Sequence, residues 1–253
     1  MFDIDKATLC VEKMKKYFSF SDEVANVEIP SNIEIGSSDY VTYIFYSCLL
    51  DYGMRSSTYH SNLIHTYQKY KDIFDPCYVV KNYEGHPEKL LEIIKRNIHP
   101  RYPNIALKKW LDLSIFLNKN YPDDQLKEKI CSLSSYKELY HFITGIKGYG
   151  QKTGGLLLRL IYESGMCHFT DELDDIPIDR HDIEISYLNG IVDKEQLNSN
   201  ELKLLGTTWI QAARSRGVSA CDIDKYLWSI GNRLCSKKRC FECPIQEECK
   251  TKM

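Results

Sequence analysis

The sequence has no long hydrophobic run and almost no strand pattern. No stretch of about 18 or more apolar residues occurs in the 253-residue chain, so no membrane-spanning helix is predicted. The first seventeen residues mix acids and lysines where a signal peptide needs an uninterrupted apolar stretch. Repeats and low-complexity segments are also lacking. We therefore expect a soluble intracellular protein with no membrane partner, located in the cytoplasm or nucleoid, or in the nucleus, depending on its source.

An excess of positive charge is missing as well. The chain has 33 lysines and arginines against 35 aspartates and glutamates, a net charge of -2 and an isoelectric point near 6.4. Net charge alone therefore does not indicate a nucleic-acid-binding protein, and any DNA-binding surface must be local. A hydrophobic fraction of 43% is enough for one large domain or two modest ones.

Apolar residues recur at helical spacing in nearly every segment, for example over Tyr40–Leu49, Leu90–Ile94 and Leu107–Phe116. The alternating stretch Val24–Gly36 is interrupted by Pro30, so we interpret it as an extended connector. The pattern predicts an all-α protein.

We divide the predicted helices into two lobes with a groove between them. One lobe spans 39–154, and the other combines 1–38 with 155–253. In the second lobe, Ser219 followed by Asp222 is a capping pattern that predicts a helix from about Ala220 to Leu234, and Gly217 closes the preceding helix.

The most informative segment is FITGIKGYGQKTGGLLLRL, which spans Phe142–Leu160. One helix is predicted to end near Thr144 and a second to begin about Gln151. Gly148 and Gly150 permit a tight turn and a close approach of the backbone to a ligand. Backbone N–H groups at the following helix start can then bind a phosphate oxygen. An ordinary loop between two helices would also explain these two glycines.

The string IKGYGQKTG, residues 146–154, resembles the helix-hairpin-helix signature of the endonuclease III superfamily of DNA glycosylases. Lys147 replaces a frequent proline, and Gly154 a frequent alanine. The resemblance implies a helix-hairpin-helix glycosylase fold with 39–154 as a helical barrel domain. It also implies a monomer that binds double-stranded DNA containing a damaged base or an abasic site. The DNA-binding residues implied here are Ile146, Lys147, Gly148, Tyr149, Gly150, Gln151 and Thr153.

In this family the lysine after the second glycine is the nucleophile of the bifunctional members, so the resemblance assigns that role to Lys152. A lysine amine can displace a base from the sugar C1′ and form a Schiff base, which permits strand cleavage by β-elimination. The amine must be neutral to attack, which requires a pKa below its usual value of about 10.4. Taken alone, a lysine in a first helical turn could equally be a phosphate contact or a solvated charge.

Asp179 precedes another predicted helix, where it could act simply as an N-cap. The string I178-D179-R180-H181 also resembles the family's segment with the essential aspartate. A carboxylate near C1′ stabilises the positive charge that develops during base excision. Spacing alone leaves other acids open, namely Asp171, Glu172, Asp174, Asp175 and Asp182. His181, grouped with the DNA-binding residues, is expected to order the loop.

Four cysteines crowd the C-terminus at positions Cys235, Cys240, Cys243 and Cys249. Thiols at this density indicate zinc or an iron–sulfur cluster. The family resemblance implies a four-iron four-sulfur cluster, although the first gap is four residues here and six in the family. The basic residues Lys237, Lys238 and Arg239 are then expected to face DNA phosphates. The other six cysteines are predicted to be reduced and buried: Cys10, Cys48, Cys77, Cys131, Cys167 and Cys221.

Together these features predict a bifunctional DNA glycosylase and abasic-site lyase of base excision repair that removes an oxidised base. The alternatives are a monofunctional glycosylase and a non-catalytic DNA-binding protein with a structural metal site. The family's base-pocket segment falls near Tyr52, Gly53, Met54 and Arg55, which lack the serine and glutamine of the pyrimidine-specific members. The damaged base therefore stays undetermined. The basic and aromatic segment His99–Trp110 is either part of the groove or ordinary surface.

Overall fold

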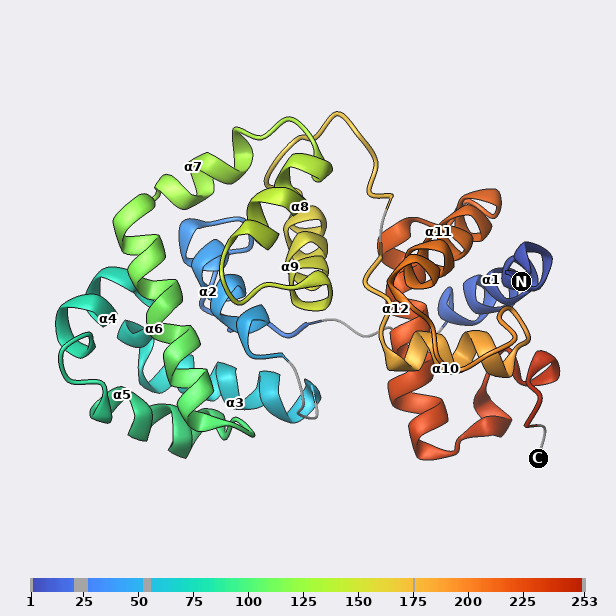
Figure 1. Ribbon diagram of the computed structural model, residues 1–253, viewed down its shortest axis with the longest axis horizontal. Helices are drawn as coiled ribbons and strands as arrows, with labels where there is room; N and C mark the ends of the chain where they lie inside the picture. The colour runs from blue at the N-terminus through green and yellow to red at the C-terminus, as the bar shows by residue number, and fades with distance from the viewer. Residues whose placement is uncertain (1, 21–26, 52–55, 175, 252–253) are drawn as a thin grey trace. The chain divides into compact units, whose positions relative to one another are not determined.

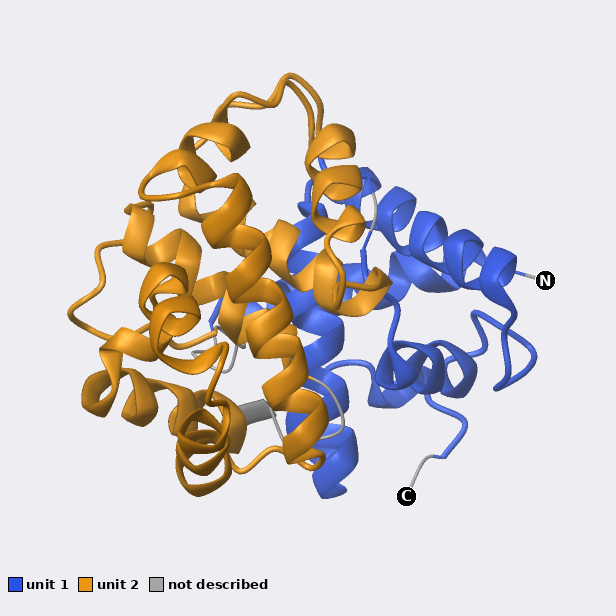
Figure 2. Ribbon diagram, turned by 60° about the vertical axis from the view of Figure 1, so that its left-hand side comes forward, with its two compact units in different colours: residues 1–26, 173–253 blue, residues 27–172 orange. Residues whose placement is uncertain are grey.

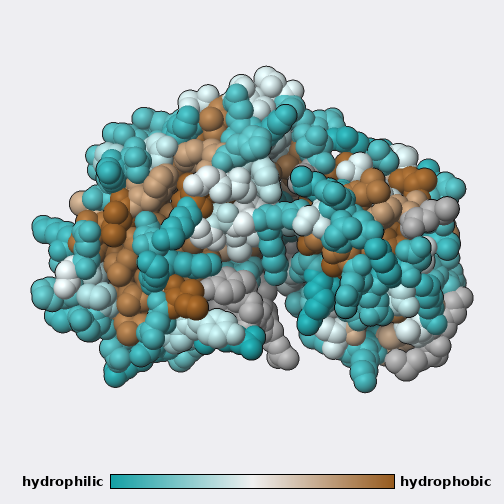
Figure 3. Space-filling model, viewed as in Figure 1, coloured by the Kyte–Doolittle hydropathy of each residue, from teal (hydrophilic) through white to brown (hydrophobic). Residues whose placement is uncertain are grey.

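The computed structural model describes residues 2–20, 27–51, 56–174 and 176–251, and it consists of helices joined by turns (Figure 1). No strand occurs among these residues, which confirms the predicted all-α fold class. No helix in the described ranges is long and apolar enough to cross a membrane. Hydrophilic residues cover most of the face shown in Figure 3, and the apolar residues on it are confined to bands and small patches.

The chain forms two compact units, which are coloured separately in Figure 2. Unit 1 comprises 1–26 and 173–253, and unit 2 comprises 27–172. These bounds differ from the division at residue 154 that we expected from the sequence. The helix after the hairpin packs on earlier helices of unit 2, so it stays with that unit.

Unit 2 is built around one buried helix, α2 (Ser38–Leu49), in which nine of twelve residues are buried. Around it lie α3 (Ser56–Lys69), η1 (Lys71–Phe74), α4 (Pro76–Tyr83), α5 (Glu88–Ile93), η2 (Ile94–Ile98), α6 (Pro103–Asn120), α7 (Gln125–Cys131), α8 (Tyr136–Gly145) and α9 (Gln151–Ser164). The Tyr46 ring stacks on Trp110 at 4.4 Å, and the Tyr46 hydroxyl lies 2.7 Å from that of Ser114. These contacts fix α6 against α2, since buried aromatic rings supply both apolar area and specific geometry.

Unit 1 combines the N-terminal helix with the C-terminal third of the chain. It contains α1 (Ile4–Phe18), α10 (Arg180–Leu188), α11 (Ser199–Ser215), α12 (Ala220–Ser229), η3 (Ile230–Leu234), η4 (Cys235–Lys237), η5 (Cys240–Glu242) and η6 (Gln246–Glu248). Helix α1 packs along α11. Lys13 of α1 pairs with Glu247 and Glu248, each at 2.8 Å, so the cysteine-rich tail is tied to the N-terminal helix.

The helix predicted from the capping pattern is confirmed. The Ser219 hydroxyl accepts a hydrogen bond from the Asp222 N–H at 3.0 Å, and α12 continues through η3 to Leu234. Gly217, with φ of +63°, follows the end of α11. Both signals are local in sequence, because a cap depends on residues within one helical turn.

Three of the six scattered cysteines differ from the prediction. Cys131 and Cys167 form a disulfide with a Cα–Cα distance of 4.9 Å, and Cys77 is exposed. Cys10, Cys48 and Cys221 are reduced and buried, as predicted. The backbone carbonyl of Ser134 accepts hydrogen bonds from the N–H and the hydroxyl of Thr170, so the segments after α7 and α9 lie side by side. The pairing of these two segments brings the sulfurs of Cys131 and Cys167 within bonding distance. The spacing of the cysteines in the sequence does not reveal this pairing.

Candidate active site

Helices α8 and α9 are joined by the hairpin turn (Figure 1), which one buried tyrosine and one glycine hold in place. Tyr149 is buried, and its hydroxyl donates a hydrogen bond of 2.6 Å to the carbonyl of Phe45 in α2. Burial raises the pKa of Tyr149 well above its usual value, so the hydroxyl keeps its proton. Gly148 has φ of +111°, and a Cβ there would meet Leu49 Cδ1 at 2.8 Å. The hairpin is therefore fixed on α2, and the helix bounds agree with those predicted.

Gly154 allows the two helices of the hairpin to pack closely. A Cβ at this position would lie 3.2 Å from Thr144 Cγ2 and 3.4 Å from Ile143 Cγ2, both in α8. A small residue is therefore required at this position in the first turns of α9.

We expect Gly148→Ala to destabilise the protein, because alanine rarely adopts this φ and its Cβ would meet a buried leucine. The free energy of unfolding, measured by urea denaturation, should fall by about 1–3 kcal/mol. Gly145→Ala is the matched control, since a Cβ there meets nothing within 4 Å. Equal stability of the two variants would contradict this account of the turn.

The start of α9 presents exposed polar groups next to the glycine turn. Gly150 is the N-cap residue and donates its N–H to the Thr153 hydroxyl at 3.1 Å. Gln151 and Lys152 are exposed in the first turn. The side chains of Ile146, Tyr149 and Thr153 are buried, so they can only support the backbone of this surface. The remaining predicted DNA-binding groups of the hairpin lie together here.

Lys147 is an exposed cation of the same turn, 75% exposed, with its Nζ 2.9 Å from Asp112 Oδ2 in α6. This hydrogen bond lowers the pKa of Asp112, which therefore stays ionised. This pair was not predictable from the sequence, since Asp112 and Lys147 are far apart in the chain.

Asp179 is the N-cap of α10 in unit 1. Its carboxylate accepts hydrogen bonds from the N–H groups of His181 (2.7 Å) and Asp182 (3.4 Å), while the Asp182 carboxylate accepts one from the Asp179 N–H at 2.6 Å. The two acids thus form a reciprocal capping box that holds the Asp179 carboxylate at the helix start. His181 packs against Gly231, where an added Cβ would lie 2.5 Å from His181 Cβ.

The two predicted catalytic residues belong to different compact units. Lys152 is in unit 2, at the start of α9, and Asp179 is in unit 1, at the start of α10. Lys152 lies in the first turn of α9 and Asp179 is the N-cap of α10, so each polar group is placed by a helix N-terminus.

The four C-terminal cysteines are partly exposed: Cys235 and Cys240 begin η4 and η5, and Cys243 and Cys249 directly follow η5 and η6. They are near enough to interact: burial raises the pKa of Cys235 to about 12, and Cys243, Cys249 and Cys240 contribute to the rise. Within the described parts of the chain, however, no three His, Cys, Asp or Glu side chains are arranged to hold a metal ion. The arrangement therefore does not support the expected four-iron four-sulfur cluster.

The basic residues of the tail differ in their surroundings. Lys237 and Lys238 are exposed, and Lys238 adopts a left-handed backbone with φ of +56°. The guanidinium of Arg239 is hydrogen-bonded to Glu242, with Nε 2.7 Å from Oε1, and this lowers the pKa of Glu242. Lys237 and Lys238 therefore present exposed positive charges, whereas the charge of Arg239 is paired with Glu242.

The predicted base-pocket residues Tyr52, Gly53, Met54 and Arg55 lie outside the described residues. On either side of them in sequence are two buried groups that our sequence analysis missed, Asp51 and His60. His60 Nε2 lies 3.7 Å from Asp51 Oδ2, and His60 Nδ1 lies 3.4 Å from the hydroxyl of Ser47. These contacts join the end of α2 to the first turns of α3.

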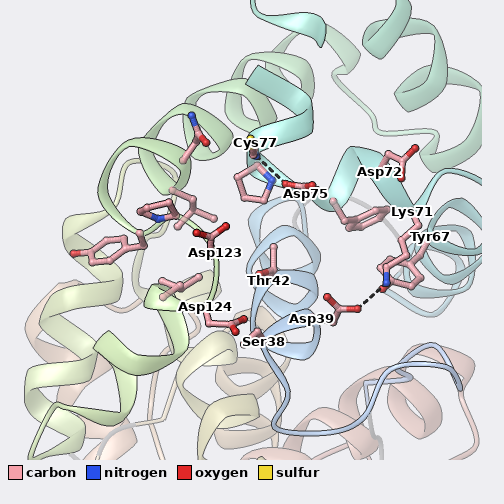
Figure 4. A pocket seen from close by; sticks show the side chains of 17 residues that line it. Ser38, Asp39, Thr42, Tyr67, Lys71, Asp72, Asp75, Cys77, Asp123 and Asp124 are labelled. Atoms are coloured by element: carbon pink, nitrogen blue, oxygen red, sulfur yellow. Dashed lines mark hydrogen bonds and ion pairs between the residues drawn. The ribbon is translucent and has the colours of Figure 1, made fainter. Parts of the chain in front are cut away.

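A pocket of about 650 Å³ in unit 2 opens between α2, η1, α4 and the segment after α6 (Figure 4). Five aspartates contribute to its lining: Asp39, Asp72, Asp75, Asp123 and Asp124. Asp39 is paired with Lys71 at 2.7 Å, and Asp75 accepts the Cys77 N–H at 2.9 Å. This excess of negative charge is unsuited to DNA phosphates. Neither the hairpin nor Lys152 contributes to the lining.

Comparison with known proteins defines the class of fold. Solved structures of helix-hairpin-helix DNA glycosylases align with nearly the whole chain, so the molecule has that fold, as predicted. No protein-family model and no curated protein sequence matches the chain.

The particular structures are 8-oxoguanine DNA glycosylases from two organisms. The enzyme of Methanocaldococcus jannaschii is 17% identical with a TM-score of 0.56, over 89% of this chain and 86% of that one. Its complex with a 15mer DNA containing 8-oxoguanine, described as a glycosylase/lyase, is 15% identical with a TM-score of 0.54, over 89% of each chain. The Thermotoga maritima enzyme is 17% identical with a TM-score of 0.53, over 88% of each chain.

Proposed function

We propose that this protein is a bifunctional DNA glycosylase and abasic-site lyase that acts inside the cell on double-stranded DNA. The observation that carries the proposal is the position of Lys152. It is an exposed amine in the first turn of α9, directly after a glycine turn whose geometry is fixed by Tyr149 and Gly148. The fold is that of glycosylases, which supports the same reading.

Lys152 would supply the nucleophile. Its amine attacks the sugar C1′ with the nitrogen lone pair, the bond between C1′ and the base breaks, and the base leaves with the bonding electrons and takes up the proton that the amine loses. No water molecule takes part in this step, because the amine itself displaces the base. Opening of the sugar ring gives a Schiff base, and removal of a C2′ proton then breaks the strand on the 3′ side.

Asp179 would stabilise the positive charge that develops on the sugar as the base departs. Its carboxylate is held at the start of α10 by the N–H groups of His181 and Asp182. A carboxylate held in this position can stabilise an oxocarbenium-like sugar. The proposal requires Asp179 and Lys152 to act on the same nucleotide.

The hairpin would hold the DNA backbone. The first N–H groups of an α-helix point out of its N-terminus, and the helix dipole adds partial positive charge there; α9 begins at Gln151. A phosphate oxygen is the ligand that such a site favours, and the contact is independent of base sequence. Lys147 adds a formal charge beside it.

We propose 8-oxoguanine as the first substrate to test, since the similar solved structures are 8-oxoguanine glycosylases. A duplex with a single 8-oxoguanine should yield free base and a nicked strand. Borohydride added during the reaction should leave a covalent complex of protein and DNA, because it reduces the Schiff base. Duplexes with an oxidised pyrimidine or a mismatched adenine serve as alternative substrates.

The three functional hypotheses give different results in this experiment. Base release without a trapped complex would indicate a monofunctional glycosylase. Binding of abasic DNA with neither base release nor trapping would indicate a non-catalytic DNA-binding protein. A trapped complex on abasic DNA without release of any tested base would support the lyase activity. The damaged base that the protein removes would then have to be sought among other lesions.

For the C-terminal tail we propose a metal-binding role that is separate from the chemistry at the sugar. Four thiols within fifteen residues are a donor set for iron–sulfur or zinc. Cys235, Cys240, Cys243 and Cys249 would be the ligands, and the bound group would order the tail.

Elemental analysis of the protein, purified without air, should find about four irons or about one zinc per chain. The amount should fall sharply in Cys240→Ser and stay unchanged in Cys77→Ser, which removes an exposed thiol of unit 2. Iron with a brown colour would identify the cluster, whereas a metal-free wild-type protein would refute the metal role.

A further inference from the structure

Helix α6 has an outward face that the proposed mechanism does not use. Its inward face packs on the core through Ala106, Trp110, Leu113 and Leu117. On the outside, Arg101 and Tyr102 precede the helix, and Ile105 and Lys108 continue at helical spacing. We call these four residues the α6 strip. All four are exposed, including 47% of Tyr102 and 50% of Ile105.

The α6 strip is joined to the hairpin through one carboxylate. Asp112, one turn beyond Lys108, lies 2.9 Å from Lys147 Nζ in the hairpin and 3.7 Å from Lys108 Nζ. Both lysines are mostly exposed, at 75% and 69%. The strip and the hairpin are therefore neighbours on one surface of unit 2, so whatever binds the hairpin also lies close to the strip.

The chemistry of this surface fits a DNA strand. Arg101, Lys108 and Lys147 carry three positive charges against the one of Asp112, on a chain whose net charge is -2. The Arg101 guanidinium lies 5.3 Å from the centre of the Tyr102 ring. Cations with exposed aromatic and apolar side chains between them suit phosphates and sugars together.

We infer that the α6 strip binds the sugar–phosphate backbone of the duplex that the hairpin holds, at nucleotides to one side of the lesion. This inference rests on the proposed function for the identity of the partner. The strip and Asp112 span 12 residues, and the 11 steps from Arg101 to Asp112 correspond to roughly 16 Å at 1.5 Å per residue. At 3.4 Å per base pair, the contact covers about five base pairs of duplex.

The test measures the salt dependence of binding to a duplex that contains a tetrahydrofuran abasic-site analogue, which cannot react. Each lost phosphate contact lowers the slope of log K against log salt by about 0.9. We expect the double variant Arg101→Ala/Lys108→Ala to lose about 1.8 from this slope, which corresponds to roughly 60-fold weaker binding near 0.1 M salt. Lys137→Ala is the control. It removes an exposed lysine from the first turn of α8, at the opposite end from the hairpin, and should leave the slope unchanged.

Truncated duplexes locate the contact. One duplex is shortened on the 5′ side of the analogue and another on the 3′ side, each to about two flanking base pairs. The double variant should bind as tightly as the wild type to one of these duplexes and more weakly than the wild type to the other. A slope equal to that of the wild type on the long duplex overturns the inference.

Failure of the inference and failure of the proposed function are distinguishable. One outcome is a reduced slope in the double variant while the wild-type protein neither releases a base nor forms a trapped complex with abasic DNA. That result would support the α6 strip as a DNA-binding surface and contradict the proposed enzymatic function. Normal trapping with an unchanged slope in the double variant would reject only the strip. Thermal melting of both variants verifies that they are folded.

Discussion

Lys152→Gln should abolish the trapped complex and reduce strand cleavage by about 10³-fold or more. The reason is chemical: an amide cannot form a Schiff base, and removing a nucleophile costs most of the rate of the step it performs. Lys152 is exposed in the first turn of α9, so the free energy of unfolding should change by no more than about 0.5 kcal/mol. Single-turnover cleavage of abasic DNA and borohydride trapping are the measurements.

Lys147→Gln is the matched control for that variant. This variant removes a positive charge from the same hairpin, five residues before Lys152. In the wild-type protein the Lys147 Nζ is paired with Asp112. It should keep the trapped complex and bind DNA more weakly, with a salt slope lowered by about 0.9. If Lys152→Gln still traps at the wild-type rate while Lys147→Gln does not, the nucleophile has been assigned to the wrong lysine.

Asp179→Asn should lower base excision by about 10²-fold and leave stability almost unchanged. Asparagine and aspartate are equally good N-caps, so the hydrogen bonds from the His181 and Asp182 N–H groups can persist. The negative charge is lost, and with it the stabilisation of the positive sugar. The rate of 8-oxoguanine release and the urea midpoint, measured on the same preparation, separate the two roles.

Two further variants complete the test of Asp179. Asp179→Ala removes cap and charge together, so it should lose activity and also about 1 kcal/mol of stability. Asp174→Asn neutralises an exposed acid of the same loop and should behave as the wild type. Full activity of Asp179→Asn would leave Asp179 as a helix cap alone, and a large loss in Asp174→Asn would move the catalytic role to that carboxylate.

Features that depend on neighbouring residues were predictable from the chain. The end of α8, the start of α9 and the cap at Ser219 all lie where the pattern indicated, because glycines and caps act within one helical turn. The all-α class followed from apolar spacing in the same way. The cysteine pattern was also local, but it indicates only which donors are near in sequence and not their arrangement in space.

Contacts between distant segments had no signal in the sequence. The disulfide of Cys131 with Cys167 and the pair Lys147–Asp112 both join residues about 35 apart. The unit boundary also differed from the expected one, because the packing of α9 on α2 and α8 assigns that helix to unit 2.

The sequence by itself determined the helical class, the glycine turn and the residue types that can do the chemistry. Only the tertiary structure decided how that turn is held, through the Tyr149 hydroxyl on Phe45 and the close approach of Gly148 to Leu49. It also decided that α6 presents a charged face beside the hairpin. The reason is that periodicity specifies which face of a helix is buried, whereas the partner of that face depends on how the whole chain packs.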